Sequence, residues 1–141
     1  MKLSPADIAF SQCVRASADY ICQMCGIQKP PVNRRGGSGM ECSHRYSRRH
    51  RTIRWAKDNA DCLCTGCHRK FGESPIDAMK WLLEHAGEGE LELLVEKRNQ
   101  IFKVPKSEEK EIANHYREQL KIIEAKRLDG VTGAIDFVSY Q

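Results

Sequence analysis

Two Cys-x-x-Cys pairs constrain this chain more than any other feature. The first is Cys22/Cys25 and the second is Cys64/Cys67, within 141 residues. A structural zinc ion takes four tetrahedral ligands, usually thiolates, and each Cys-x-x-Cys turn places two sulfurs on one metal. The pattern therefore predicts one structural Zn²⁺ bound by these four cysteines. Because 38 residues separate the two pairs, we expect a further structural unit between them.

The chain holds seven cysteines, an odd number. It has no apolar run of transmembrane length, and its first residues lack the apolar stretch of a secretory signal. These features predict a cytoplasmic protein without a membrane partner, where paired cysteines act as metal ligands rather than disulfides. We interpret Cys13, Cys42 and Cys62 as small buried side chains. An exchange of roles between Cys62 and Cys64 is an alternative, although Cys62 breaks the spacing.

Positive charge is concentrated between the cysteine pairs. The segment 34–57 carries eight Lys or Arg residues against one acid, Glu41, so it holds +7 of a chain whose net charge is +4. A basic segment of this kind favours a polyanion, most simply nucleic acid. We expect the DNA contacts among Arg45, Arg48, Arg49, Arg51, Arg54 and Lys57. The alternative is a solvated basic surface.

Capping residues and apolar spacing predict several helices. Ser4, Pro5 and Asp7 form a helix start, and Ser74-Pro75-Ile76-Asp77 forms another. We expect helices over 5–19, 75–85, 90–102 and 107–129, the last capped by Ser107. Its apolar stripe is expected in the core or at a dimer seam: Ile112, Tyr116, Leu120 and Ile123.

The predicted fold class is α+β and mainly helical. We divide the chain into an N-terminal helix (1–19), a zinc-stapled core (20–73), a helical extension (74–130) and a C-terminal tail (131–141). Within the core, residues 28–40 are expected to form an exposed loop. Residues 40–55 are expected to form a short hairpin or strand and loop, and the second cysteine pair should open a helix. The tail is predicted to be an added strand or disordered.

Three residues around the basic segment suit phosphodiester hydrolysis. They are His44, Asn59 and His68, the last directly after the second cysteine pair. A neutral imidazole can deprotonate water near neutral pH, and a divalent metal beside it can stabilise the charge that develops on phosphate. An asparagine can steady the loop that carries the base. Asn59 as a simple helix cap, and His68 as a structural zinc ligand, are the alternatives.

The order Cys-x-x-Cys, His, Asn, Cys-x-x-Cys-His resembles the HNH, or His-Me finger, nuclease superfamily. The stretches His44–Arg49 and Thr52–Asn59, followed by Cys64-Thr65-Gly66-Cys67, are similar to the lambdoid phage NinG/Rap recombination nucleases. The match covers about residues 20–73. It implies a ββα-metal core between the two cysteine pairs. It also implies an endonuclease that acts on branched recombination DNA such as Holliday junctions or D-loops, in the bacterial cytoplasm if phage-encoded.

By position, the resemblance assigns His44 as the general base and Asn59 as the residue that steadies its loop. His68 would be the ligand of a catalytic Mg²⁺ or Mn²⁺. Many relatives place an Asp directly before the base as a second metal ligand, but this chain has Ser43 there. Ser43 is a weak candidate ligand, so His68, water and DNA phosphates would hold the metal.

Two other functions stay open. One is a zinc-containing module that binds nucleic acid without cutting it, and the missing Asp before His44 favours it. The other is a general nicking or double-strand endonuclease of the HNH type without a preference for branches. An enzyme that cuts two opposed strands of a junction favours a homodimer.

Overall fold

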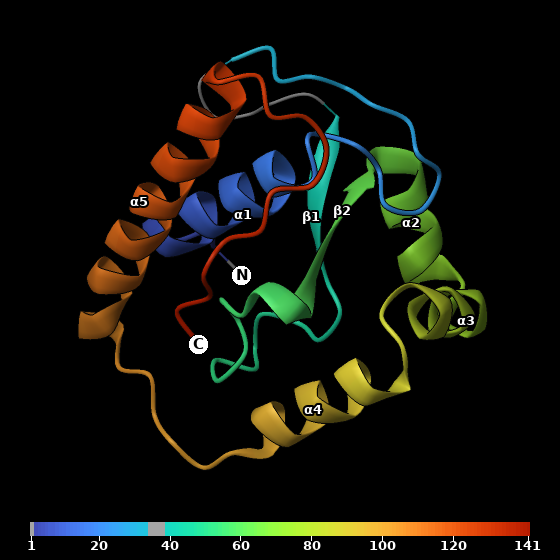
Figure 1. Cartoon of the computed structure of the whole chain (residues 1–141). Coiled ribbons are helices and arrows are strands. Elements are labelled where there is room, and N and C mark those ends of the chain that lie inside the picture. Colours follow the sequence, from blue (N-terminus) through green and yellow to red (C-terminus); the bar gives the residue numbers. More distant parts are fainter. Residues whose placement is uncertain (1, 34–38) are drawn as a thin grey trace.

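The computed structural model describes residues 2–33 and 39–141. The described elements, in chain order, are α1 (Pro5–Ser17), β1 (Met40–His44), η1 (Lys57–Asn59), β2 (Ala60–Cys64), α2 (Thr65–Glu73), α3 (Pro75–His85), α4 (Glu88–Asn99), η2 (Lys106–Glu108) and α5 (Glu109–Leu128). Figure 1 shows α1 between α5 and the two strands, with α2 and α3 beyond the strands. The predicted α+β, mainly helical class is confirmed for this part of the chain. Arg34, Arg35 and the centre of the expected 28–40 loop lie outside the described residues.

The two strands form an antiparallel sheet that leads directly into α2. Met40 pairs with Cys64 and His44 pairs with Ala60. The outer edge of β2 is covered by the first cysteine turn, because Gln23 bonds both backbone groups of Cys62, through its N–H at 2.9 Å and its Oε1 at 2.7 Å. Around the first cysteine turn, Ile21 and Gln28 form only an isolated antiparallel bridge. The ββα-metal resemblance implies a second strand, but no residue pattern predicted β2 at Ala60–Cys64.

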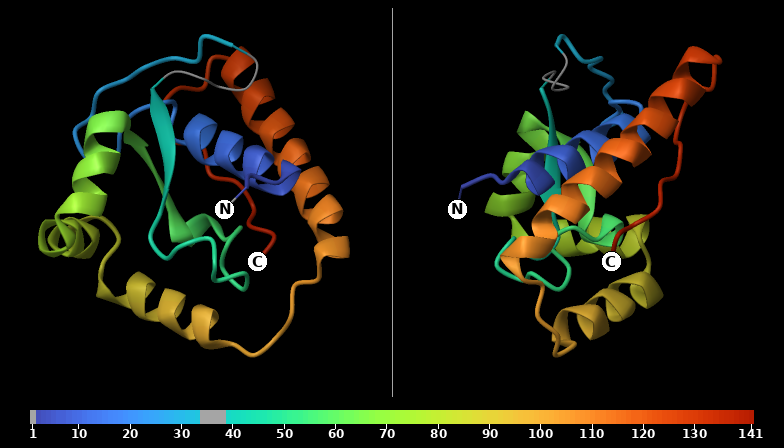
Figure 2. Two further views of the ribbon diagram at one scale, coloured as in Figure 1. Left: turned by 180° about the vertical axis from the view of Figure 1, so that it is seen from behind. Right: turned by 90° about the vertical axis from the view of Figure 1, so that its left-hand side faces the viewer.

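Helix α1 is the centre of the main core. It begins as the sequence predicts, with a capping box between Ser4 and Asp7. Its apolar face packs on α5, where Phe10 meets Tyr116 edge-on at 5.0 Å between ring centroids, and Figure 2 shows the two helices side by side. Three stripe residues of α5 are fully buried in this core and Leu120 is partly buried against it: Ile112, Tyr116 and Ile123. The stripe therefore belongs to the core and is not a dimer seam.

A buried carboxylate joins α1 to the loop 45–56 between the strands. Asp7 is 4% exposed and accepts hydrogen bonds from Arg54 Nε at 3.0 Å, Arg54 Nη2 at 2.6 Å and Trp55 Nε1 at 3.1 Å. Burial raises the pKa of Asp7, but the bonds from Arg54 and Ser4 outweigh burial and lower the pKa below its ordinary value. On its other side the loop packs against α4, where Ile53 and Ala56 form a small apolar cluster with Leu94 of that helix.

The C-terminal tail is neither a strand nor loose. Figures 1 and 2 show it running back along α1, where Ile135 N–H donates to Ser17 at 2.9 Å. Further on, Ser139 accepts from Lys57 N–H at 3.1 Å and Gln141 accepts from Trp55 N–H at 3.3 Å. The buried hydroxyl of Tyr116, on α5, donates a hydrogen bond to the Trp55 carbonyl. The tail thus ties α1 and α5 to the loop that contains Trp55.

Two predicted helix starts differ in detail. Ser107 lies inside η2 and does not cap, so α5 begins at Glu109 without a side-chain cap. Ser74 precedes α3 as expected, but its side chain makes no capping hydrogen bond. The expected helix 90–102 is α4, which begins and ends a few residues earlier. Across the described residues, none of the helices combines the length and the apolar character that crossing a membrane requires.

Replacing Asp7 by Ala should destabilise the fold strongly. The change leaves the Arg54 guanidinium buried without its anion, a loss of about 3–5 kcal/mol in the free energy of unfolding. Urea denaturation measures the effect, and Asp129→Ala, at an exposed carboxylate, is the control that should change stability by less than about 0.5 kcal/mol. A similar small effect for both variants would contradict the role given to Asp7.

The same contact predicts an acid dependence. The pKa of Asp7 is lowered in the folded chain, so its contribution is complete above the ordinary carboxyl pKa of about 4 and is lost as the pH falls through the folded value. The stability gap between the wild type and Asp7→Ala should therefore narrow below about pH 4. Urea titrations at several pH values measure the gap, and a gap that widens in acid would refute the argument.

Candidate functional site

The four predicted zinc ligands meet at one point. Their Sγ atoms all lie within 4.8 Å of one another, forming the four-cysteine cluster: Cys22, Cys25, Cys64 and Cys67. The sulfurs of Cys25 and Cys64 are 3.8 Å apart. Tetrahedral zinc with Zn–S bonds of about 2.3 Å separates its sulfurs by about 3.8 Å. The four-cysteine cluster therefore fits a structural metal such as zinc.

Backbone N–H groups around the four-cysteine cluster favour the ionised thiolate form that binds a metal cation. In each turn the second cysteine directs its N–H at the first sulfur, with Cys25 at 3.5 Å from Cys22 and Cys67 at 3.4 Å from Cys64. Burial raises the pKa of Cys22, but backbone N–H groups outweigh it and hold the pKa at about 7. Burial and the three neighbouring sulfurs raise the pKa of Cys67. Four crowded sulfurs cannot all ionise without a positive charge among them, and a bound metal supplies that charge.

The remaining cysteines lie outside the four-cysteine cluster. Cys13 and Cys62 are fully buried, and Cys42 faces Cys62 across the sheet. Burial raises the pKa of each of these thiols to about 12. Cys13 and Cys62 are buried packing residues, as interpreted from the sequence, whereas Cys42 is only partly buried and lines a cavity of about 660 Å³. Cys62 lies outside the four-cysteine cluster and does not replace Cys64.

His44 ends β1 with its ring fixed by the following loop. Its Nε2 lies 3.1 Å from the carbonyl oxygen of Arg54. A carbonyl only accepts, so Nε2 carries the proton and Nδ1 keeps its lone pair. Burial lowers the pKa of His44 and the positive charge of Arg48 lowers it further. The bond to the Arg54 carbonyl raises the pKa, but the net effect is a lowered pKa. The ring is therefore neutral at pH 7, as a general base must be.

His44 and His68 line the same cavity. Its volume is about 660 Å³, and its wall comes from α1, β1, the loop after β1 and α2. Polar groups of this wall include Ser11 and Arg15 of α1, which no sequence motif indicated. No local sequence pattern could indicate that these two residues line a cavity, because the cavity forms only when α1 packs beside β1. The cavity is large enough to admit a nucleotide.

His68 is paired with the single acid of the basic segment. Its Nδ1 lies 2.7 Å from Glu41 Oε1, and Glu41 Oε2 accepts from Thr65 Oγ1 at 2.8 Å. Burial raises the pKa of Glu41, but the bonds from His68 and Thr65 outweigh burial and lower the pKa. Glu41 lines the cavity with both histidines. The sequence left the place of Glu41 undetermined, because no spacing rule relates it to His68.

Asn59 holds the loop after His44 from the inside. It is fully buried, and its Nδ2 donates to the carbonyls of Tyr46 at 3.0 Å and Ile53 at 3.1 Å. Its Oδ1 accepts from Tyr46 N–H at 2.8 Å. These bonds fix both ends of the loop segment 46–53. Asn59 closes η1, and its side chain bonds the loop rather than a helix terminus.

Ser43 is not brought to the cavity. It is 1% exposed and pairs with Asp61 across the sheet, and the cavity wall does not include it. Asp61, its partner on β2, faces a second cavity of about 290 Å³. Neither residue therefore lies where it could join His68 on a metal.

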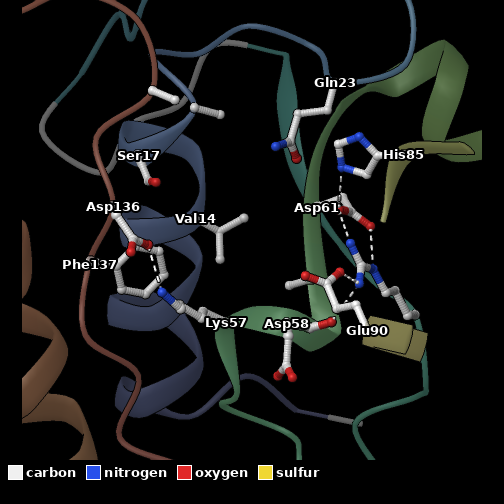
Figure 3. Close-up of a pocket in the computed structure, with 14 residues that line it drawn as sticks. Val14, Ser17, Gln23, Lys57, Asp58, Asp61, His85, Glu90, Asp136 and Phe137 are labelled. Carbon is white, nitrogen blue, oxygen red and sulfur yellow. Dashed lines mark hydrogen bonds and ion pairs between the residues drawn. The ribbon is translucent and has the colours of Figure 1, made fainter. Parts of the chain in front are cut away.

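Asp61, His85 and Glu90 line the second cavity (Figure 3), and Arg45 belongs to the same wall. Arg45 binds both oxygens of Asp61 at 2.9 Å and reaches Glu90 of α4 at 2.6 Å, with 6% of its side chain exposed. His85 of α3 approaches the same carboxylate at 3.2 Å. Burial raises the pKa of Asp61, but His85 and Arg45 outweigh burial and lower the pKa. Arg45 therefore links the sheet to α3 and α4, and its predicted role in DNA binding is corrected.

Most of the other predicted DNA-binding cations are also engaged. Arg54 is buried on Asp7, so it too is corrected to a structural residue. Arg51 binds Glu109 at 2.9 Å and Lys57 binds Asp136 at 2.7 Å. Arg48 lines the cavity and lies 3.6 Å from Asp7. Arg49 is exposed, so it keeps the place that a DNA contact requires.

Comparisons with known proteins add no relative. No family model matches this chain, and no match was found among curated proteins or solved structures. The resemblance to the HNH superfamily is therefore an expectation from the sequence alone.

The four-cysteine cluster predicts one zinc ion per chain and a fold that depends on it. Structural zinc contributes about 10–16 kcal/mol in small domains, which is comparable to the whole stability of a domain. Chelation, or Cys64→Ser, should therefore unfold the segment 20–70. Elemental analysis and circular dichroism measure metal content and structure. Cys42→Ala is the control and should keep one zinc, whereas a metal-stripped wild type with unchanged structure would refute the prediction.

Proposed function

We propose that this protein is a metal-dependent DNA endonuclease of the HNH type. The observation that carries the proposal is the shared cavity of His44 and His68. The antiparallel β1–β2 pair followed at once by α2 matches the order of a ββα-metal core. The four-cysteine cluster joins the first cysteine turn to the β2–α2 junction, as in zinc-containing members of the superfamily.

His44 is the proposed general base. Its neutral ring directs Nε2 at the Arg54 carbonyl, and the lone pair of Nδ1 takes a proton from the water that attacks phosphorus. Asn59 keeps the loop that supplies this carbonyl in one conformation through its bonds to Tyr46 and Ile53. General-base catalysis of this kind contributes roughly 10²–10⁴ in rate.

His68 is the proposed ligand of a catalytic Mg²⁺ or Mn²⁺. The side chains fit such an ion, since Nδ1 is taken by Glu41 and the other ring nitrogen remains for a metal. A bound divalent cation would stabilise the charge on the phosphate and on the leaving oxygen. Magnesium usually keeps several waters and takes few protein ligands beside substrate phosphates, so a site with few side-chain donors is adequate.

The cavity suits a phosphate backbone. Arg48 lines it, and guanidinium groups bind phosphate oxygens well. Outside it, Arg49 after β1 and Arg69 and Lys70 on α2 are exposed. These cations form the proposed DNA contact surface, in place of Arg45 and Arg54.

The proposed substrate is branched recombination DNA, in phage or prophage recombination. The similarity of residues 44–67 to NinG/Rap nucleases supports this choice. A second candidate is a zinc module that binds DNA without cutting it, because no carboxylate directly precedes His44. The position of His44, with the lone pair of its Nδ1 available, favours the enzyme over the binding module.

Replacing His44 by Ala should abolish cutting and preserve DNA binding. The assay uses the zinc-loaded protein and compares a four-way junction, a nicked duplex and a linear duplex, each with Mg²⁺, with Mn²⁺ or with no added divalent cation. We expect metal-dependent cutting, strongest on the junction, and a loss of at least about 10² in rate for the variant. His115→Ala, on α5 outside the cavity, is the control and should cut normally. If the wild type binds DNA but does not cut it with either metal, the nuclease proposal is wrong.

The two kinds of arginine should behave differently in binding assays. Arg49→Ala should weaken binding several-fold for every DNA and lower the salt dependence by about one phosphate contact, with unchanged stability. Arg45→Ala should instead lower stability, by up to about 3–5 kcal/mol, because the buried Asp61 loses its two bonds from Arg45 and keeps only His85. Fluorescence anisotropy at several salt concentrations and urea denaturation separate the two effects. A stable Arg45→Ala protein with weakened binding would reverse these roles.

A further inference from the structure

We propose that Glu41 positions His68 for the divalent cation of the proposed site, as a carboxylate that orients a metal-binding histidine. The inference rests on the proposed function, since it concerns the metal ligand of that site. Neither the cysteine pattern nor the resemblance assigns a role to Glu41.

Both oxygens of Glu41 are used by the first turn of α2. Oε1 lies 2.7 Å from His68 Nδ1, and Oε2 accepts from Thr65 Oγ1 at 2.8 Å. Thr65 is the first residue of α2, and His68 follows in the same turn. Glu41 is in β1. The carboxylate therefore connects the strand that carries His44 to the helix turn that carries His68.

The contact also fixes which nitrogen of His68 can bind a metal. An ionised carboxylate has only acceptors, so Nδ1 of His68 must carry the proton of this bond. The lone pair then resides on Nε2. A histidine that donates its other N–H to a carboxylate is the usual arrangement of metal-binding histidines, and loss of the carboxylate typically weakens metal affinity 10–100-fold.

Strand geometry explains why Glu41 rather than Ser43 can act. Residues two apart on a strand share a face, so Glu41 and Ser43 point the same way from β1. Ser43 is nearly inaccessible opposite Asp61, whereas Glu41 lies nearer the start of α2 and lines the cavity. Glu41 is therefore close enough to α2 to reach His68, whereas Ser43, two positions later on the same face, is not.

The experiment measures Mn²⁺ binding to the zinc-loaded protein by isothermal titration calorimetry, alongside the Mn²⁺ dependence of junction cutting. Glu41→Met keeps the length of the side chain without an acceptor, and it should weaken Mn²⁺ binding 10–100-fold. Glu41→Ala should do the same. Glu41→Gln retains an oxygen that can accept from Nδ1, so it should restore binding to within a few-fold of the wild type.

Glu73→Ala is the matched control, since it removes an exposed glutamate from the end of the same helix and should bind Mn²⁺ normally. Zinc content and circular dichroism verify that each variant is folded. If Glu41→Ala does not fold, Glu41→Met alone provides the test. Wild-type affinity in folded Glu41→Met would overturn the positioning role and leave the nuclease proposal intact. An equal loss in the Gln and Met variants would also overturn it, since charge and not the bond would then matter. A wild type that neither binds Mn²⁺ nor cuts DNA would instead remove the proposed function itself.

Discussion

The arrangement of the proposed site depends on one buried carboxylate, Asp7. It caps α1, accepts two bonds from Arg54 and one from the Trp55 indole. The backbone carbonyl of that same Arg54 accepts from His44. The position of α1 therefore determines the position of Arg54, and through it the tautomer of the proposed base. A buried guanidinium without its anion would be costly, so this chain of contacts tolerates little variation.

The basic segment serves the interior more than its composition indicates. Arg45 and Arg54 each bind a buried acid, Asp61 and Asp7. Arginine suits such places because its planar group bonds a carboxylate through two parallel N–H donors. The segment's charge of +7 therefore overstates the cationic surface. The argument from net charge predicts a polyanion as the partner, but it cannot separate arginines that face solvent from arginines that organise the loop.

Local patterns predicted the features whose causes are local. The Cys-x-x-Cys spacing indicated all four members of the four-cysteine cluster, and the Ser4–Asp7 box and Pro75 indicated two helix starts. Strand β2 was missed because Ala60–Cys64 has no β-branched residue. The contacts of Glu41 with His68 and of Asp7 with Arg54 join residues 27 and 47 positions apart. No periodicity encodes such pairs, so they become visible only when the folded chain brings them together.

The packed tail has a consequence for the order in which the site is assembled. Trp55 and Lys57 bond residues 86 and 82 positions later in the chain, Gln141 and Ser139. A growing chain on the ribosome reaches the histidines and cysteines long before it reaches these partners. The loop beside His44 is therefore completed only when residues 135–141 have emerged and folded back. The ligands of the four-cysteine cluster all lie within residues 22–67, whereas the last restraints on this loop come from Ser139 and Gln141.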